Sequence, residues 1–157
     1  MPCVSSDKYL CVLSYTLIYP IGVKMTDYTS KNRTKYLLQF HLIFSTKYRR
    51  NILSGSFGEE LKSKMKEIAN GSRFGIEYIE VDKDHIHMLV SHEPNISVSQ
   101  IVRKLKSEST YWAWEKHESF LRKQYWKSRH IWTPAHFCCS IGNVSREKLA
   151  EYIENQG

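Results

Sequence analysis

Two histidines separated by one residue are the side chains of this sequence best suited to chemistry. His85 and His87 lie in the apolar run 84–90, which follows a turn-like Asp-Lys-Asp segment at 82–84 and is typical of a strand. Residues two apart on a strand point to the same face. Two imidazoles held together in this way are half of a divalent metal site. The competing interpretation is a pair of histidines on a half-exposed sheet face that binds nothing.

A second pair of reactive side chains stands near the end of the sequence. Residues 145–156 are predicted to form a helix with Ser145 as its N-cap. Tyr152 and Gln156 are four residues apart and therefore share one helix face. A tyrosine phenol can act as a nucleophile, and a glutamine carbonyl is a hard oxygen ligand. The alternative is that both belong to an ordinary amphipathic stripe with Leu149 and Ile153.

The charge of the chain favours a polyanionic partner. Lysine and arginine number 23 against 16 acidic residues, which gives a net charge of +7. The chain also carries ten tyrosines and four tryptophans, and flat rings suit the unpaired bases of a nucleic acid. A basic surface without a nucleic-acid partner is the alternative. The candidate phosphate contacts are Lys47, Arg49 and Arg50 in a segment without acids, and Arg103, Lys104 and Lys106 on a predicted helix.

The four cysteines are not expected to form a disulfide framework. None is in a Cys-x-x-Cys pair, and Cys138 and Cys139 are adjacent, so a reducing cytoplasm is the expected compartment. Strand alternation predicts one of these two thiols in the core and the other outside. Residues 1–30 are interpreted as an extension outside the fold. The uncharged stretch 9–23 is too short to span a bilayer, so no membrane role is expected.

The remaining residues, 31–157, are expected to form a single domain. Alternating apolar residues predict strands at 36–44, 76–81, 84–90 and 137–141. Helical spacing predicts a helix over 56–70 with capping-box spacing at Ser56 and Glu59, and a second helix that begins at Ser97. The order is βαββαβ, which indicates a ferredoxin-like or RRM-like α+β fold: an antiparallel sheet with helices on one face, plus the C-terminal helix.

The chain resembles the HUH-type single-tyrosine transposases of the IS two-hundred-like insertion sequences, which include the REP-associated tyrosine transposases. The matching segments cover about 35–156 and occur in the order and spacing of the family. They are Tyr36–Phe44 with Lys47–Arg50, then Asp84–Val90, Ile131–Thr133, Ile141–Ser145 and Tyr152–Gln156. Family members usually have a tyrosine-phenylalanine pair where this chain has His136-Phe137, and a Lys-Gly step where it has Lys106-Ser107.

The resemblance implies a role for each matched residue. His85, His87 and Gln156 would bind a Mg²⁺ or Mn²⁺ ion, and Tyr152 would attack a phosphorus atom to give a 5′-phosphotyrosine link. The substrate would be single-stranded DNA with hairpins at the ends of the element. The protein would be a homodimer whose active sites are shared between subunits, and it would be cytoplasmic and associated with the nucleoid.

Two other functions are compatible with the same residues. One is a non-catalytic or degenerate protein that binds DNA or RNA hairpins through its basic and aromatic side chains. The other is a domesticated relative that processes repeated hairpins of the host chromosome without mobilising an element.

Overall fold

The computed structural model describes residues 29–31 and 33–141. Its elements in chain order are β1 (Thr29–Lys31), β2 (Thr34–Tyr36), β3 (Gln39–Ser45), the 3-10 turn η1 (Lys47–Arg49), α2 (Ser56–Asn70), β4 (Phe74–Val81), β5 (His85–His92), α3 (Val98–Lys116), α4 (Glu118–Gln124) and β6 (Phe137–Ile141). The predicted helix at 145–156 lies outside the described residues, as does most of the 1–30 extension.

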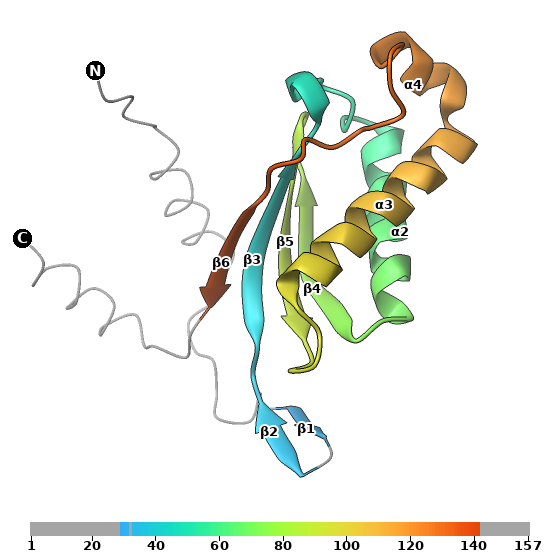
Figure 1. Cartoon of the computed structure of the whole chain (residues 1–157). Coiled ribbons are helices and arrows are strands. Elements are labelled where there is room, and N and C mark those ends of the chain that lie inside the picture. Colours follow the sequence, from blue (N-terminus) through green and yellow to red (C-terminus); the bar gives the residue numbers. More distant parts are fainter. Residues whose placement is uncertain (1–28, 32, 142–157) are drawn as a thin grey trace, which may run out of the picture.

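The main sheet has four antiparallel strands in the order β4-β5-β3-β6. Helices α2 and α3 lie on one side of it (Figure 1). The two central strands, β5 and β3, are not consecutive in the sequence, which is the arrangement that the βαββαβ order predicts. The predicted fold class is therefore confirmed.

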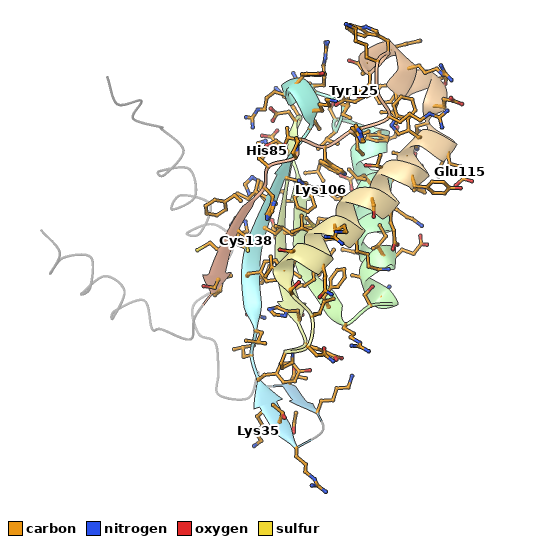
Figure 2. All side chains as sticks on the ribbon, in the orientation of Figure 1. Lys35, His85, Lys106, Glu115, Tyr125 and Cys138 are labelled. Atoms are coloured by element: carbon orange, nitrogen blue, oxygen red, sulfur yellow. The ribbon has the colours of Figure 1, made fainter. Side chains whose placement is uncertain are left out.

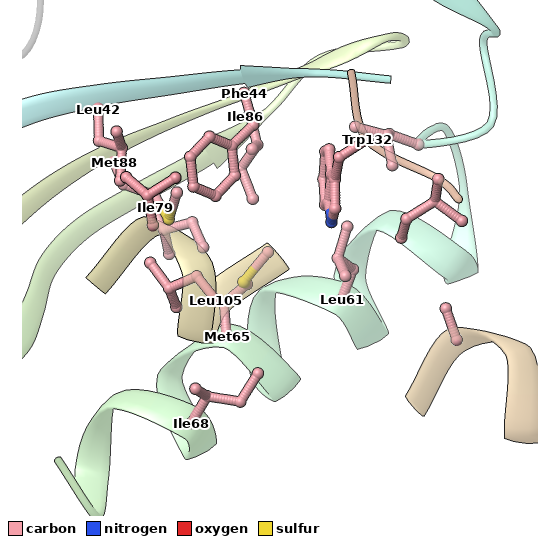
Figure 3. Close-up of a cluster of buried hydrophobic side chains, with 14 of the residues drawn as sticks. Leu42, Phe44, Leu61, Met65, Ile68, Ile79, Ile86, Met88, Leu105 and Trp132 are labelled. Atoms are coloured by element: carbon pink, nitrogen blue, oxygen red, sulfur yellow. The ribbon is translucent and has the colours of Figure 1, made fainter. Parts of the chain in front are cut away.

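The core lies between the sheet and these two helices (Figure 3). Alternation decides which side chains enter it, since Leu42, Phe44, Ile86 and Met88 all point toward the helices. Each of these four is completely buried, whereas His85 and His87, which alternate with Ile86 and Met88 along β5, point to the opposite face. This period of two fixes the register of β5, because a slip of one residue would exchange the histidines for the core side chains.

Strand boundaries follow the sequence pattern closely except at the beginning of the domain. The run predicted as one strand over 36–44 is divided, since Tyr36 ends a small β1-β2 hairpin and β3 begins at Gln39. The hairpin strands are almost entirely exposed, so they carry no apolar alternation by which they could be recognised.

Helix α3 begins as predicted, whereas α2 begins differently. The Ser97 side chain accepts from the backbone N–H of Gln100, and the Gln100 side chain accepts from the backbone N–H of Ser97, which completes a capping box. The capping box predicted for Ser56 is wrong. Ser56 is the first helical residue, and Gly55 occupies the N-cap position with φ of +73° and without a side-chain cap.

The two adjacent cysteines do not divide between core and surface as predicted. Cys138 is exposed and Cys139 is half-buried. Every residue of β6 is exposed or half-buried and none belongs to the hydrophobic core, so the layer that buries the side chains of β3 does not extend over β6.

Candidate active site

The two histidines project from β5 near its first residue, on the face of the sheet opposite α2 and α3. Their ring centroids lie 4.8 Å apart. Ser45 of β3 pairs with His85, and His87 is flanked by Ile43 of β3 and Glu80 of β4. Because His85 and His87 lie on a central strand paired on both sides, the backbone that carries them is rigidly held. The sequence prediction that the two rings lie together is borne out.

A carboxylate orients the first imidazole. The Nδ1 atom of His85 lies 2.7 Å from Oδ1 of Asp84, and the other oxygen of Asp84 lies 2.7 Å from Nε of Arg49. A carboxylate only accepts, so we assign the proton to Nδ1, which leaves the lone pair of Nε2 available. Asp82 is 3.8 Å from Nε2, beyond hydrogen-bond distance. A carboxylate behind a histidine is the usual support of a metal-binding imidazole.

The second imidazole is kept neutral by its surroundings. Burial lowers the pKa of His87 to about 4, with smaller contributions from the nearby His85 and His41. The ring of His41 on β3 stacks against that of His87 at 5.5 Å, and burial lowers its pKa as well. His87 is therefore uncharged at neutral pH, and its Nδ1 atom is buried without a hydrogen-bond partner among the described residues. A neutral ring with a lone pair to offer is what a metal ligand requires.

These two rings cannot hold a metal ion by themselves. Within residues 29–31 and 33–141, no group of three histidine, cysteine, aspartate or glutamate side chains could do so. The pair therefore needs a further ligand, and an amide oxygen such as that of Gln156 would suit Mg²⁺ or Mn²⁺. Gln156 lies outside the described residues, and so does Tyr152. The roles of both residues stay predictions.

The basic side chains at 47–50 gather beside the histidine pair. Arg49 bonds to Asp84 and also donates to the hydroxyl of Ser45 at 3.1 Å. Lys47 donates to the hydroxyl of Ser128 at 2.9 Å. Arg50 is half-buried, and its Nε finds no hydrogen-bond partner in the described part of the chain. This cluster brings positive charge to the end of the sheet that carries His85.

The three predicted phosphate contacts on α3 have different surroundings. Arg103 is exposed, and Lys104 forms an ion pair with Glu108 at 2.6 Å. Lys106 lies between α3 and the sheet (Figure 2), where its ammonium donates to the carbonyls of Thr133, Pro134 and Ala135. Burial lowers the pKa of Lys106. Its contacts make it a tether for the segment that leads into β6, whereas a phosphate contact by Lys106 stays a prediction.

Sequence reasoning missed two features of this site. One is His41, whose ring stacks on His87; the alternation of β3 places it on the same face, but the pairing register was needed to bring the two rings together. The other is the link from Arg49 through Asp84 to His85, which joins residues 36 positions apart in the sequence. An aspartate immediately before the histidine pair was the only available signal.

Comparison with known proteins places the chain in a family. The family model described as "Transposase IS200 like" matches residues 34–156, and the chain belongs to this family. Among curated relatives, the ISDra2 transposase TnpA of Deinococcus radiodurans is 29% identical over 121 residues, which cover 77% of this chain and 85% of the relative. The transposase of insertion sequence element IS200 from Salmonella typhimurium is 27% identical over 132 residues, or 84% of this chain and 85% of the relative.

Solved structures agree with this membership. A crystal structure assigned as a transposase from Deinococcus radiodurans R1 superposes with a TM-score of 0.66 and 26% identity, covering 82% of this chain and 97% of that one. A REP-associated tyrosine transposase bound to a REP hairpin shares the fold, with a TM-score of 0.51 and 16% identity over 80% of this chain and 69% of that one. The family resemblance inferred from the motifs is confirmed. None of the helices formed by the described residues is long and apolar enough to cross a membrane.

Proposed function

We propose that this protein nicks and rejoins single-stranded DNA at the hairpin-bearing ends of an insertion sequence, through a 5′-phosphotyrosine intermediate formed on Tyr152. The observation that carries the proposal is the histidine pair. His85 and His87 lie 4.8 Å apart with a carboxylate behind one ring and the other ring neutral, in a chain that belongs to a transposase family.

The chemistry is a transesterification at phosphorus. The phenolic oxygen of Tyr152 forms a bond to the scissile phosphorus, the bond from phosphorus to the 3′ oxygen breaks, and the proton lost by the phenol is balanced by the one gained by the 3′ oxygen. The number of phosphodiester-type bonds is unchanged, so a 3′-OH of another strand can reverse the step without ATP. A divalent ion held by His85, His87 and Gln156 would polarise the phosphate and orient the leaving oxygen.

The residues of the chain have separate tasks in this scheme. Asp84 fixes the proton of His85 on Nδ1, so that Nε2 faces the site as a base rather than a donor. Lys47 and Arg50 supply positive charge for phosphates next to the scissile one. The solved relative bound to a REP hairpin supports hairpin DNA as the substrate class.

A covalent-adduct assay tests this proposal. Single-stranded DNA that carries the end hairpins of the element is incubated with the protein and Mn²⁺ or Mg²⁺, and the products are separated on a denaturing gel. We expect a protein–DNA adduct with the wild type and none with Tyr152→Phe or His85→Ala. Tyr111→Phe, which removes an exposed phenol of α3, is the matched control and should form the adduct as the wild type does.

The same experiment separates the competing function. Binding of the hairpin by the wild type without any adduct, with either metal, would contradict the proposal and favour a module that binds hairpins without chemistry. An adduct that persists in Tyr152→Phe would contradict the assignment of the nucleophile.

A further inference from the structure

Two large aromatic rings stand in solvent at the end of the molecule that carries η1. Tyr48 and Trp126 are each 70% exposed, and we call them the aromatic platform. Trp126 differs from the other tryptophans, since Trp114 and Trp132 are buried and Trp112 packs against the core. A single exposed ring, such as that of Tyr111, is ordinary on a protein surface, so a ligand is indicated only by the surroundings of these two rings.

Tyr48 and Trp126 lie in two segments, 46–50 and 125–131, that are joined by hydrogen bonds through Lys47. The backbone N–H of Lys47 donates to the carbonyl of Ile131, and its own carbonyl accepts from the hydroxyl of Tyr125 at 3.2 Å. Its ammonium donates to Ser128 and lies 5.3 Å from the centroid of the Tyr48 ring. The backbone that carries the aromatic platform is therefore held by several hydrogen bonds, and the ammonium of Lys47 lies beside the Tyr48 ring.

The backbone under Tyr48 is strained. Tyr48 and Arg49 have φ of +60° and +54°, a left-handed conformation that costs non-glycine residues free energy. Thr46, which is fully buried, holds the turn through its hydroxyl, which donates to the carbonyl of Arg50 at 2.8 Å. Neither side chain enters the core, since both are exposed, and only that of Arg49 has polar partners, Asp84 and Ser45. In this strained turn the Tyr48 ring stands in solvent.

The charges around the platform suit a polyanion. No acidic residue occurs in the sequence from 28 to 58 or from 119 to 146, which includes both segments of the platform. Lys127 and His130 are exposed beside Trp126. The preceding acid, Glu118, is bonded to Arg122 and Arg129. A base that stacked here would thus find cations for its phosphates, while the carboxylates of Asp84 and Glu118 beside these segments are each paired with arginine.

The platform is also connected to the histidine pair. Arg49, next to Tyr48, bonds to Asp84, which bonds to His85. The backbone N–H of Thr46 donates to the carbonyl of Asp84 at 2.8 Å. The strained turn and the first histidine therefore share one hydrogen-bonded unit at the same end of the sheet.

From these observations we propose that Tyr48 and Trp126 form a stacking site for unpaired bases of single-stranded DNA, beside the nucleotide whose phosphate lies at the histidine pair. The position of this stacking site relative to the cleaved bond rests on the proposed function, whereas the binding of bases by the two rings does not. Lys47 and Lys127 would bind the flanking phosphates.

The test is a binding titration in the Tyr152→Phe background without added metal, so that no cleavage occurs and the outcome does not depend on that of the adduct assay. The probe is an oligodeoxyadenylate of about 12 nucleotides. We expect quenching of tryptophan fluorescence by the probe, and Trp126→Leu should weaken binding about 5- to 150-fold. Tyr111→Leu removes a ring of equal exposure, 71%, from α3 and is the matched control, with affinity expected to be unchanged.

Two further measurements distinguish stacking from a structural role. Tyr48→Gly should weaken binding while its thermal midpoint stays equal or rises, because glycine relieves the left-handed strain. The salt dependence of binding should be unchanged by Trp126→Leu, whereas Lys127→Ala should reduce the magnitude of the slope by about 0.7.

Several results would overturn the proposal. One is equal DNA affinity of the Trp126→Leu and Tyr111→Leu variants. Another is a loss of affinity in Trp126→Leu that is just as large for an oligonucleotide without bases. The third is a lowered thermal midpoint of the Tyr48→Gly variant. A change of sedimentation coefficient in Trp126→Leu without DNA would also overturn it, since the ring would then belong to a protein–protein interface.

Discussion

Asp84 is the residue on which the geometry of the candidate site depends most. Its two oxygens bond to His85 and Arg49, so one side chain both fixes the proton of an imidazole and neutralises a guanidinium. The first contact joins neighbouring residues, and the second reaches only to η1. The orientation of His85 is therefore set locally, by its immediate neighbour and one turn.

We expect Asp84→Asn to lower the affinity for Mn²⁺ about 10- to 100-fold, because an amide no longer stabilises the ring orientation as a carboxylate does. Titration followed by the electron paramagnetic resonance of Mn²⁺ measures this without DNA. Asp82→Asn is the matched control, since Asp82 is largely exposed and lies 3.8 Å from His85. Equal Mn²⁺ affinities for the two variants would show that Asp84 does not support the site.

Tyr125 gives the site region a characteristic response to alkali. Burial raises the pKa of Tyr125 to about 12, from the ordinary value of 10.0. The unfolded chain thus releases this proton earlier than the folded one as the pH rises. The protonated Tyr125 phenol therefore makes its full contribution to the free energy of unfolding below pH 10. This contribution is lost between about pH 10 and 12, at up to about 1.4 kcal/mol per pH unit.

Comparing the pH dependence of the free energy of unfolding in wild type and Tyr125→Phe checks this expectation. The wild type should lose stability more steeply than the variant above pH 10, with parallel curves at neutral pH. The variant should be less stable by about 1 kcal/mol at neutral pH, because the bond to the carbonyl of Lys47 is lost. Parallel curves throughout the alkaline range would refute the shifted ionisation.

At the scale of elements, the sequence predicts strands whose alternation is complete and helices with an apolar stripe. β6 was predicted at its observed limits, and β5 within two residues, because the information is local. Helix α4 was missed, since its seven residues bury a single side chain, Leu121. The role of Lys106 could not be predicted either, because the carbonyls it binds belong to a segment 27 to 29 residues away.

The two helix starts show why local patterns need a structural check. Ser97 caps α3 with both bonds of a capping box, whereas Ser56 has similar spacing and caps nothing. We expect Ser97→Ala to lower the free energy of unfolding by about 1 kcal/mol, and Ser56→Ala to change it by less than about 0.5 kcal/mol. Chemical denaturation of both variants measures the difference. Equal losses would mean that the capping bonds of α3 contribute nothing.

At the scale of the whole molecule, the site appears in two parts. The sheet supplies the histidine pair, Asp84 and the neighbouring cations, while the proposed nucleophile and third ligand belong to 145–156, after the edge strand β6. Two arrangements are therefore compatible with the sequence: Tyr152 serves the histidine pair of its own chain, or that of a second chain. Spacing in the sequence is the same in both cases, which is why the sequence could not choose between them.

Mixing two inactive variants decides between these arrangements. Tyr152→Phe retains the histidine pair, and His87→Ala retains the tyrosine. If sites are shared in a dimer, coexpression of the two chains in equal amounts should restore roughly one quarter of the wild-type adduct, because half of the dimers are mixed and each contains one complete site. The adduct should form only on the His87→Ala chain, which an affinity tag on one variant identifies by its size. If each tyrosine serves its own chain, no mixture can form the adduct, since every chain lacks one half of the site.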